Sequence, residues 1–163
     1  MPERIGATTR FRFRREQRLR TPAHFERLRA VEPRYRAARR WLLVAMRVEG
    51  VGEPAADRAS SPAAPAAGTE KGAGAVRVRF GITVGKRNAR HAVQRSLVKR
   101  IVREAMRHSA PRLEMAARGR TVDLVLRLKA PFPKPESMSL PVFKRALRAE
   151  ADQSLATMCE RLS

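Results

Sequence analysis

The residues best suited to chemistry in this chain lie between Lys86 and Arg107, where the sequence reads KRNARHAVQRSLVKRIVREAMR. At about 100° per residue, a helix over this stretch places its cations on one side, namely Arg95, Lys99, Arg100, Arg103 and Arg107. The opposite side carries apolar residues that can pack on a core, namely Val93, Leu97, Val98, Ile101, Val102 and Ala105. Glu104 stands only at the border of the cationic arc. Because like charges repel, this arc predicts a partner that supplies anions, such as the phosphates of a nucleic acid.

The alternative interpretation is a solvated helix face with no partner. Such faces usually mix acids and bases, because pairs at i,i+4 spacing stabilise the helix, and this arc contains no acid. We therefore favour phosphate binding. The turn before the helix adds Lys86, Arg87 and Arg90 to the same cationic region.

The overall charge supports the same class of partner. The 163 residues include 36 Lys and Arg against 15 Asp and Glu, a net charge of +21, which favours a nucleic acid or an anionic membrane surface. Helices that lie on membranes usually present Trp, Phe and Leu on their apolar side, whereas this helix presents Val, Ile and Ala, so we expect no membrane partner. Because no apolar run follows the basic N-terminus, we also expect no signal peptide and no spanning helix. The single Cys159 fits a reducing cytoplasm, and the like charge predicts a monomer in the absence of RNA.

Side chains for catalysis by the protein itself are not evident. His24, His91 and His108 are scattered and lack metal-ligand spacing, and the carboxylates fall on different predicted elements. We therefore expect no catalytic residue, no metal site and no cofactor bound by the protein alone. His91 is interpreted as a residue at a helix N-terminus.

The first half of the chain predicts one helix, two or three strands and two irregular segments. Residues 1–17 are expected to form a basic disordered arm, and Thr21 followed by Pro22 predicts a helix over 22–30. The apolar run 41–48 predicts a strand buried on both faces, with a short strand over 35–39 before it. The Ala, Pro, Gly and Ser content of 50–75 predicts a disordered insert. Alternation over 76–84 predicts a further strand.

The second half predicts a helix, a strand and a helix. The basic helix should run over 91–108 and be ended or interrupted by Pro111. Alternation over 121–128 places Asp123 and Arg127 outward, and a helix over 140–158 begins after Ser139. The prediction is a single α+β domain over 18–158, a sheet covered by helices, with a tail over 159–163.

These residues resemble the protein subunit of bacterial ribonuclease P. The run RSLVKRIVRE over 95–104 is similar to the signature helix of that family, FGITVGKR over 80–87 to its strand and basic turn, and RLRTPAHF over 18–25 to its first helix entry. Two positions depart from the signature: Ser96 stands in place of Asn, and Leu97 in place of a second Arg.

The resemblance implies an αβββαβα two-layer sandwich with a left-handed crossover, which is also found in a domain of a small-subunit ribosomal protein. It implies a subunit of an endoribonuclease whose RNA subunit binds Mg²⁺ and cleaves precursor tRNA at the mature 5′ end. The protein would assist that hydrolysis and contribute no catalytic side chain. Its partners would be the catalytic RNA subunit and precursor tRNA.

The resemblance also implies two sets of site residues. Contacts with the RNA subunit are expected from Lys86, Arg87, Arg90, Arg95, Lys99, Arg100, Arg103 and Arg107. A cleft between the first helix and the sheet would hold the single-stranded 5′ leader through Arg18, Arg20, Phe25, Arg77 and Arg79. Phe25 and Trp41 can stack on bases or belong to the core, and core is favoured for Trp41. The alternatives in function are a ribosomal or ribosome-assembly protein and an autonomous nuclease.

Overall fold

The protein is described by a computed structural model that covers residues 15–30, 35–49 and 78–163. Residues 1–14 of the predicted arm, Arg77 and the predicted insert over 50–75 lie outside this part of the chain. Arg15–Gln17 form a short 3-10 helix, η1, in which Gln17 is buried and donates from Nε2 to Glu114 Oε1 at 2.8 Å. The end of the predicted arm therefore belongs to the folded domain.

The remaining elements follow the predicted αβββαβα order. They are α1 (Pro22–Ala30), β1 (Tyr35–Ala38), β2 (Leu42–Glu49), β3 (Val78–Thr83), α2 (Ala92–Ala117), β4 (Thr121–Leu128) and α3 (Leu140–Leu162). The sheet order is β1-β2-β4-β3, so β4 lies between two strands that precede it in the chain. β3 and β4 are parallel and are joined through α2, whereas the other neighbours are antiparallel. This arrangement confirms the predicted α+β domain.

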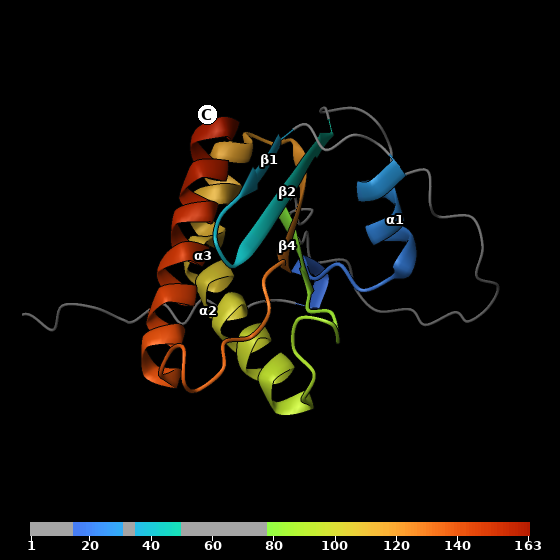
Figure 1. Ribbon diagram of the computed structural model, residues 1–163. Helices are drawn as coiled ribbons and strands as arrows, with labels where there is room; N and C mark the ends of the chain where they lie inside the picture. Colours follow the sequence, from blue (N-terminus) through green and yellow to red (C-terminus); the bar gives the residue numbers. More distant parts are fainter. Residues whose placement is uncertain (1–14, 31–34, 50–77) are drawn as a thin grey trace, which may run out of the picture.

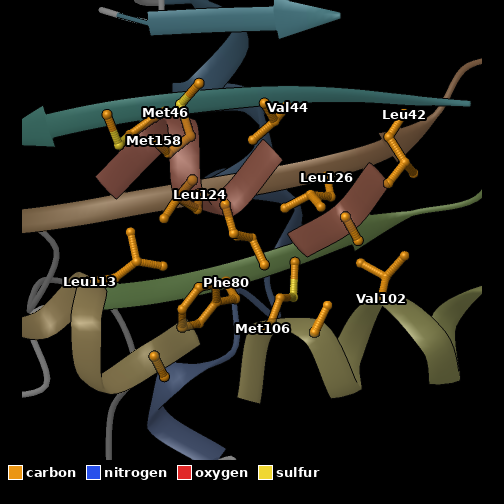
Figure 2. Packing of buried hydrophobic residues seen from close by; sticks show 14 of the residues in the cluster. Leu42, Val44, Met46, Phe80, Val102, Met106, Leu113, Leu124, Leu126 and Met158 are labelled. Carbon is orange, nitrogen blue, oxygen red and sulfur yellow. The ribbon is translucent and has the colours of Figure 1, made fainter. Parts of the chain in front are cut away.

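Helices cover the two faces of the sheet unequally. α2 and α3 pack side by side on one face, and α1 lies alone on the other (Figure 1). The core fills the space between the sheet and the helix pair, where Phe80 of β3 lies beside Met106 and Leu113 of α2 (Figure 2). β4 contributes the buried side chains predicted by its alternation, Val122, Leu124, Leu126 and Leu128.

Two helices extend beyond their predicted ends. α2 continues through Pro111 to Ala117, because Leu113 and Ala117 are completely buried and their packing offsets the roughly 3 kcal/mol that an internal proline costs. α3 continues to Leu162, whose side chain is buried and whose carbonyl accepts a hydrogen bond from Arg120. The prediction of a tail over 159–163 is therefore wrong for residues 159–162.

The buried side of α2 also differs from the prediction. Val93, assigned to the apolar side, is 79 % exposed, and Leu97 is half-buried. Val98, Val102 and Ala105 are buried as predicted. The buried stripe continues over Met106, Ala110, Leu113 and Ala117, so its centre lies about a quarter of a turn from that of the predicted side. The sequence pattern ended at His108 and so missed the second half of this stripe.

The prediction that β2 is buried on both faces is wrong. Leu42, Val44 and Met46 point into the core and are buried, whereas Leu43 and Ala45 on the other face are only half-buried. Both of these residues line a groove beside α1. The apolar run of β2 therefore packs into the core on one face and lines a groove on the other.

Candidate nucleic-acid interface

The turn between β3 and α2 is held in place by hydrogen bonds within the turn and by a hydrogen bond to the end of β4. Asn88 and Ala89 donate their backbone N–H groups to the Gly85 carbonyl, each at 3.1 Å. The Asn88 side chain donates to the Leu128 carbonyl at 2.7 Å, and the Asn88 backbone carbonyl accepts from the Phe132 N–H at 2.6 Å. Ala89 is buried, while the turn's three cations, Lys86, Arg87 and Arg90, are exposed.

The start of α2 adds to the positive potential of this turn. His91 is the N-cap residue, as predicted, and its backbone N–H is bonded to Gln94 Oε1 at 3.3 Å. The first turn of this 26-residue helix contains no acid, although helix N-termini favour negative charge because of the aligned peptide dipoles. The helix therefore meets the turn with an unneutralised positive end that suits an external anion.

Three cations of α2 continue the surface. Lys99, Arg100 and Arg103 are exposed, and no charged group within the described ranges pairs with them. We call these three and the turn's Lys86, Arg87 and Arg90 the cationic face. No Asp or Glu occurs anywhere between residues 85 and 103, so the six side chains remain available to a polyanion.

The two other predicted cations of this helix are engaged within the protein. Arg95 is half-buried, and its Nη1 donates to the carbonyls of Ala89 at 3.0 Å and Arg90 at 2.6 Å. Arg107 donates from Nε to Glu104 Oε2 at 3.1 Å and from Nη2 to Oε1 at 2.5 Å. The hydrogen bond from Arg107 holds the pKa of Glu104 below its ordinary value. Spacing alone did not distinguish these residues from the six of the cationic face.

A groove lies between α1 and the exposed side of the sheet. It has a volume of about 190 Å³ and is lined by Phe25, Leu28, Arg36, Leu43, Ala45, Thr83, Val125 and Arg127. The ring of Phe25 rests on Gly81, where an added Cβ would come within 2.8 Å of the ring atom Cε1. The groove therefore combines a half-buried aromatic ring, apolar walls and two arginines.

Arg36 and Arg127 were not among the predicted site residues. Both are exposed and have no charged partner in the part of the chain that the structure describes. Strand register explains their place, because Arg127 pairs with both Leu43 and Thr83, and Arg36 pairs with Ala45. Alternation had placed Arg127 outward, but only the order of the strands shows that it lines the groove beside α1.

Arg79, a predicted leader contact, is held in a half-buried ion pair with Asp123. It donates from Nε to Asp123 Oδ1 at 2.7 Å and from Nη2 to Oδ2 at 2.8 Å. Asp123 lies on the predicted outward face, but its side chain is only 6 % exposed. Because the carboxylate of Asp123 neutralises Arg79, the sheet surface around this pair carries less positive charge than the groove.

Two further predicted leader residues, Arg18 and Arg20, lie outside the groove. Arg18 and Arg20 are exposed on the segment between η1 and α1, which follows the outer edge of β3 through the hydrogen bond from the Leu19 N–H to the Phe80 carbonyl at 2.8 Å. Neither residue lines the groove, and Arg77 lies outside the described residues. Trp41 is a core residue, because it is buried and meets the Phe143 ring edge-on at 5.1 Å.

Within residues 15–30, 35–49 and 78–163, no three His, Cys, Asp or Glu side chains form a group that could hold a metal ion. None of the helices in the described ranges is long and apolar enough to cross a membrane.

The family follows from comparison of the sequence. A sequence model of the family described as Ribonuclease P matches residues 13–156. The chain belongs to this family. The ribonuclease P match covers η1 and every helix and strand up to most of α3.

Two curated relatives carry the name ribonuclease P protein component. The ribonuclease P protein component of Ralstonia pickettii is 38 % identical over 85 residues, which are 52 % of this chain and 56 % of that protein. The ribonuclease P protein component of Bordetella petrii is 42 % identical over 82 residues, 50 % of this chain and 59 % of that protein. The chain thus spans little more than half the length of these relatives.

A solved structure supports the fold. The RNase P protein of Staphylococcus aureus superimposes with a TM-score of 0.54 at 14 % identity, covering 90 % of this chain and 98 % of that one. At this identity the comparison supports the arrangement of the helices and strands alone.

Proposed function

We propose that this chain is the protein component of a ribonuclease P, which assists an RNA subunit in endonucleolytic maturation of the 5′ end of tRNA. The cationic face binds the RNA subunit, and the groove beside α1 binds the 5′ leader of precursor tRNA. The protein acts as a monomer before it meets RNA, in the cytoplasm. Family membership and the two surfaces support this proposal.

The observation that carries the proposal is the cationic face. Its six exposed cations lie on a turn clamped to β4 and on a helix whose reverse side is buried in the core. Because hydrogen bonds and packing fix the backbone that carries these cations, phosphate binding has to order their side chains but not the turn or the helix. The positive N-terminal end of α2 adds to the same field.

The groove suits a single strand of nucleic acid better than a duplex. Phe25 offers a ring for base stacking, and Arg36 and Arg127 stand at the walls for the sugar-phosphate backbone. Phe25 also packs on Gly81, so its side chain is part of both the packing of α1 on the sheet and the candidate binding surface.

The chemistry of hydrolysis is assigned to the RNA subunit. That subunit would bind the Mg²⁺ ions that activate water for attack on the phosphodiester. The side chains of this protein would bind and orient RNA: the cationic face would hold the RNA subunit, and the groove would hold the leader next to it.

A cleavage assay tests the proposal. Precursor tRNA is incubated in Mg²⁺ with the protein, with RNase P RNA, and with both. We expect no cleavage by the protein alone and faster cleavage by the RNA when the protein is present. Cleavage by the protein alone would indicate an autonomous nuclease. Absence of stimulation would overturn the proposal and favour a ribosomal or ribosome-assembly role.

A further inference from the structure

We propose that Arg95 is a positioning residue, which holds the 85–90 turn in the shape that presents Lys86, Arg87 and Arg90, and that it does not itself contact phosphate. This inference rests on the proposed function, because it concerns how the RNA-binding surface is built. It separates Arg95 from Lys99 and Arg103, which occupy the same helix at i,i+4 spacing.

The direction of the side chain supports this role. Helical side chains lean toward the N-terminus of their helix, and Arg95 follows this tendency back past the first turn of α2. Its Nη1 reaches the carbonyls of two consecutive residues, Ala89 and Arg90, at 3.0 and 2.6 Å. Since one nitrogen serves both acceptors, the guanidinium fixes the orientation of two successive peptide groups.

The position of these carbonyls explains why a cation is needed there. They lie at the junction of the turn and α2, beside the exposed Arg90. A carbonyl oxygen carries partial negative charge and needs a hydrogen-bond donor, and an unpaired one near the RNA would repel phosphate. Arg95 satisfies both oxygens and replaces their negative potential with positive charge.

The turn is held on its other side by Asn88. This side chain donates to the Leu128 carbonyl at the end of β4 at 2.7 Å. The turn is therefore clamped between the sheet and the helix by one polar side chain on each side. Loss of either clamp should disorganise the turn's three cations together, while the cations farther along α2 keep their places.

A double-mutant cycle tests this division. Binding of RNase P RNA is measured at fixed salt for Arg95→Gln, Arg87→Gln and the double variant. Arg87→Gln should weaken binding about tenfold in the wild-type background but less than about threefold when Arg95 is already replaced, because the turn no longer presents Arg87. Asn88→Ala should reduce the effect of Arg87→Gln in the same way.

Arg103→Gln is the matched control, since this exposed arginine does not touch the turn. In its background Arg87→Gln should keep its full, about tenfold, effect. A double variant of Arg95 and Arg87 whose loss equals the product of the single losses, within about twofold, would mean that Arg95 contacts RNA independently. A simple loss of fold stability would weaken RNA binding but would not reduce the effect of Arg87→Gln in particular.

A measurement on the free protein separates this inference from the proposed function. Arg95→Gln should accelerate hydrogen exchange of the Asn88 and Ala89 amides, which donate to the Gly85 carbonyl, whereas Arg103→Gln should not. Unchanged exchange at these amides would overturn the positioning role even if RNA binding fell. If the wild-type protein did not bind RNase P RNA, the proposed function would fail, and the exchange result would still decide whether Arg95 holds the turn.

Discussion

Reversing the charge of Lys99 and Arg103 to Glu should weaken assembly with the RNA subunit by about three orders of magnitude. Both side chains are exposed, have no charged partner among the described residues and stand one helical turn apart. A unit-charge pair at about 4 Å contributes roughly 1 kcal/mol in water, and reversal replaces this attraction with repulsion of similar size. The change is then about 2 kcal/mol per residue and about 4 kcal/mol for both.

The assay is filter binding of labelled RNase P RNA over a range of salt concentrations. Besides the lower affinity, the slope of log K against log salt should become shallower by about two, because two phosphate contacts are lost. The double variant should remain folded, since neither residue is buried, and thermal unfolding checks this.

Charge reversal at the far end of the helix pair provides the control. Arg118, which follows α2, and Arg161, in the last turn of α3, are exposed at the end of these helices opposite the 85–90 turn, and Arg118→Glu with Arg161→Glu changes the net charge of the protein by the same amount. This variant should lose far less affinity than the α2 variant. Equal losses in the two variants would refute the reasoning, because the RNA would then respond to net charge and not to one surface.

Four further outcomes are expected. Wild-type affinity should fall roughly a thousandfold between 50 and 200 mM salt if the six cations of the cationic face each neutralise a phosphate, as salt titration would show. Glu104→Gln should raise the affinity for RNase P RNA several-fold at pH 7 and steepen the slope of log K against log salt by about one, because it removes the carboxylate that pairs with Arg107. The lowered pKa keeps Glu104 ionised at pH 7. The stabilisation from the pair is fully present above the ordinary carboxylate pKa and is lost only as pH falls through the lowered value. Gly81→Ala should displace the Phe25 ring and weaken binding of leader-containing precursor tRNA to the holoenzyme, with assembly unchanged in gel shifts. Asp123→Asn should destabilise the fold by about 1 to 3 kcal/mol in urea unfolding, since it leaves Arg79 without its carboxylate in a half-buried site.

The fold was largely accessible from local sequence patterns. Pro22 marked the start of α1, and alternation gave β4 with the bounds that the structure has. The end of α2 was not accessible, because the effect of Pro111 depends on the burial of Leu113 and Ala117, which is a property of the tertiary packing.

The candidate site was accessible only in outline. Charge and spacing identified the cationic region, but they did not show that Arg95 turns back onto two carbonyls or that Arg107 pairs with Glu104. The groove arginines, Arg36 and Arg127, depend on strands that are distant in sequence and adjacent in the sheet. Pairing between distant segments cannot be read from periodicity within one segment.

The reactivity of individual lysines toward an amine-acylating reagent, with and without bound RNase P RNA, tests the central claim most directly. Lys86 and Lys99 lie on the cationic face, whereas Lys144 is exposed on α3. The expected result is strong protection of Lys86 and Lys99 in the complex and weaker protection of Lys144. Protection of Lys144 while Lys86 and Lys99 stay reactive would contradict the account, because RNA would then be held by a different face of the protein.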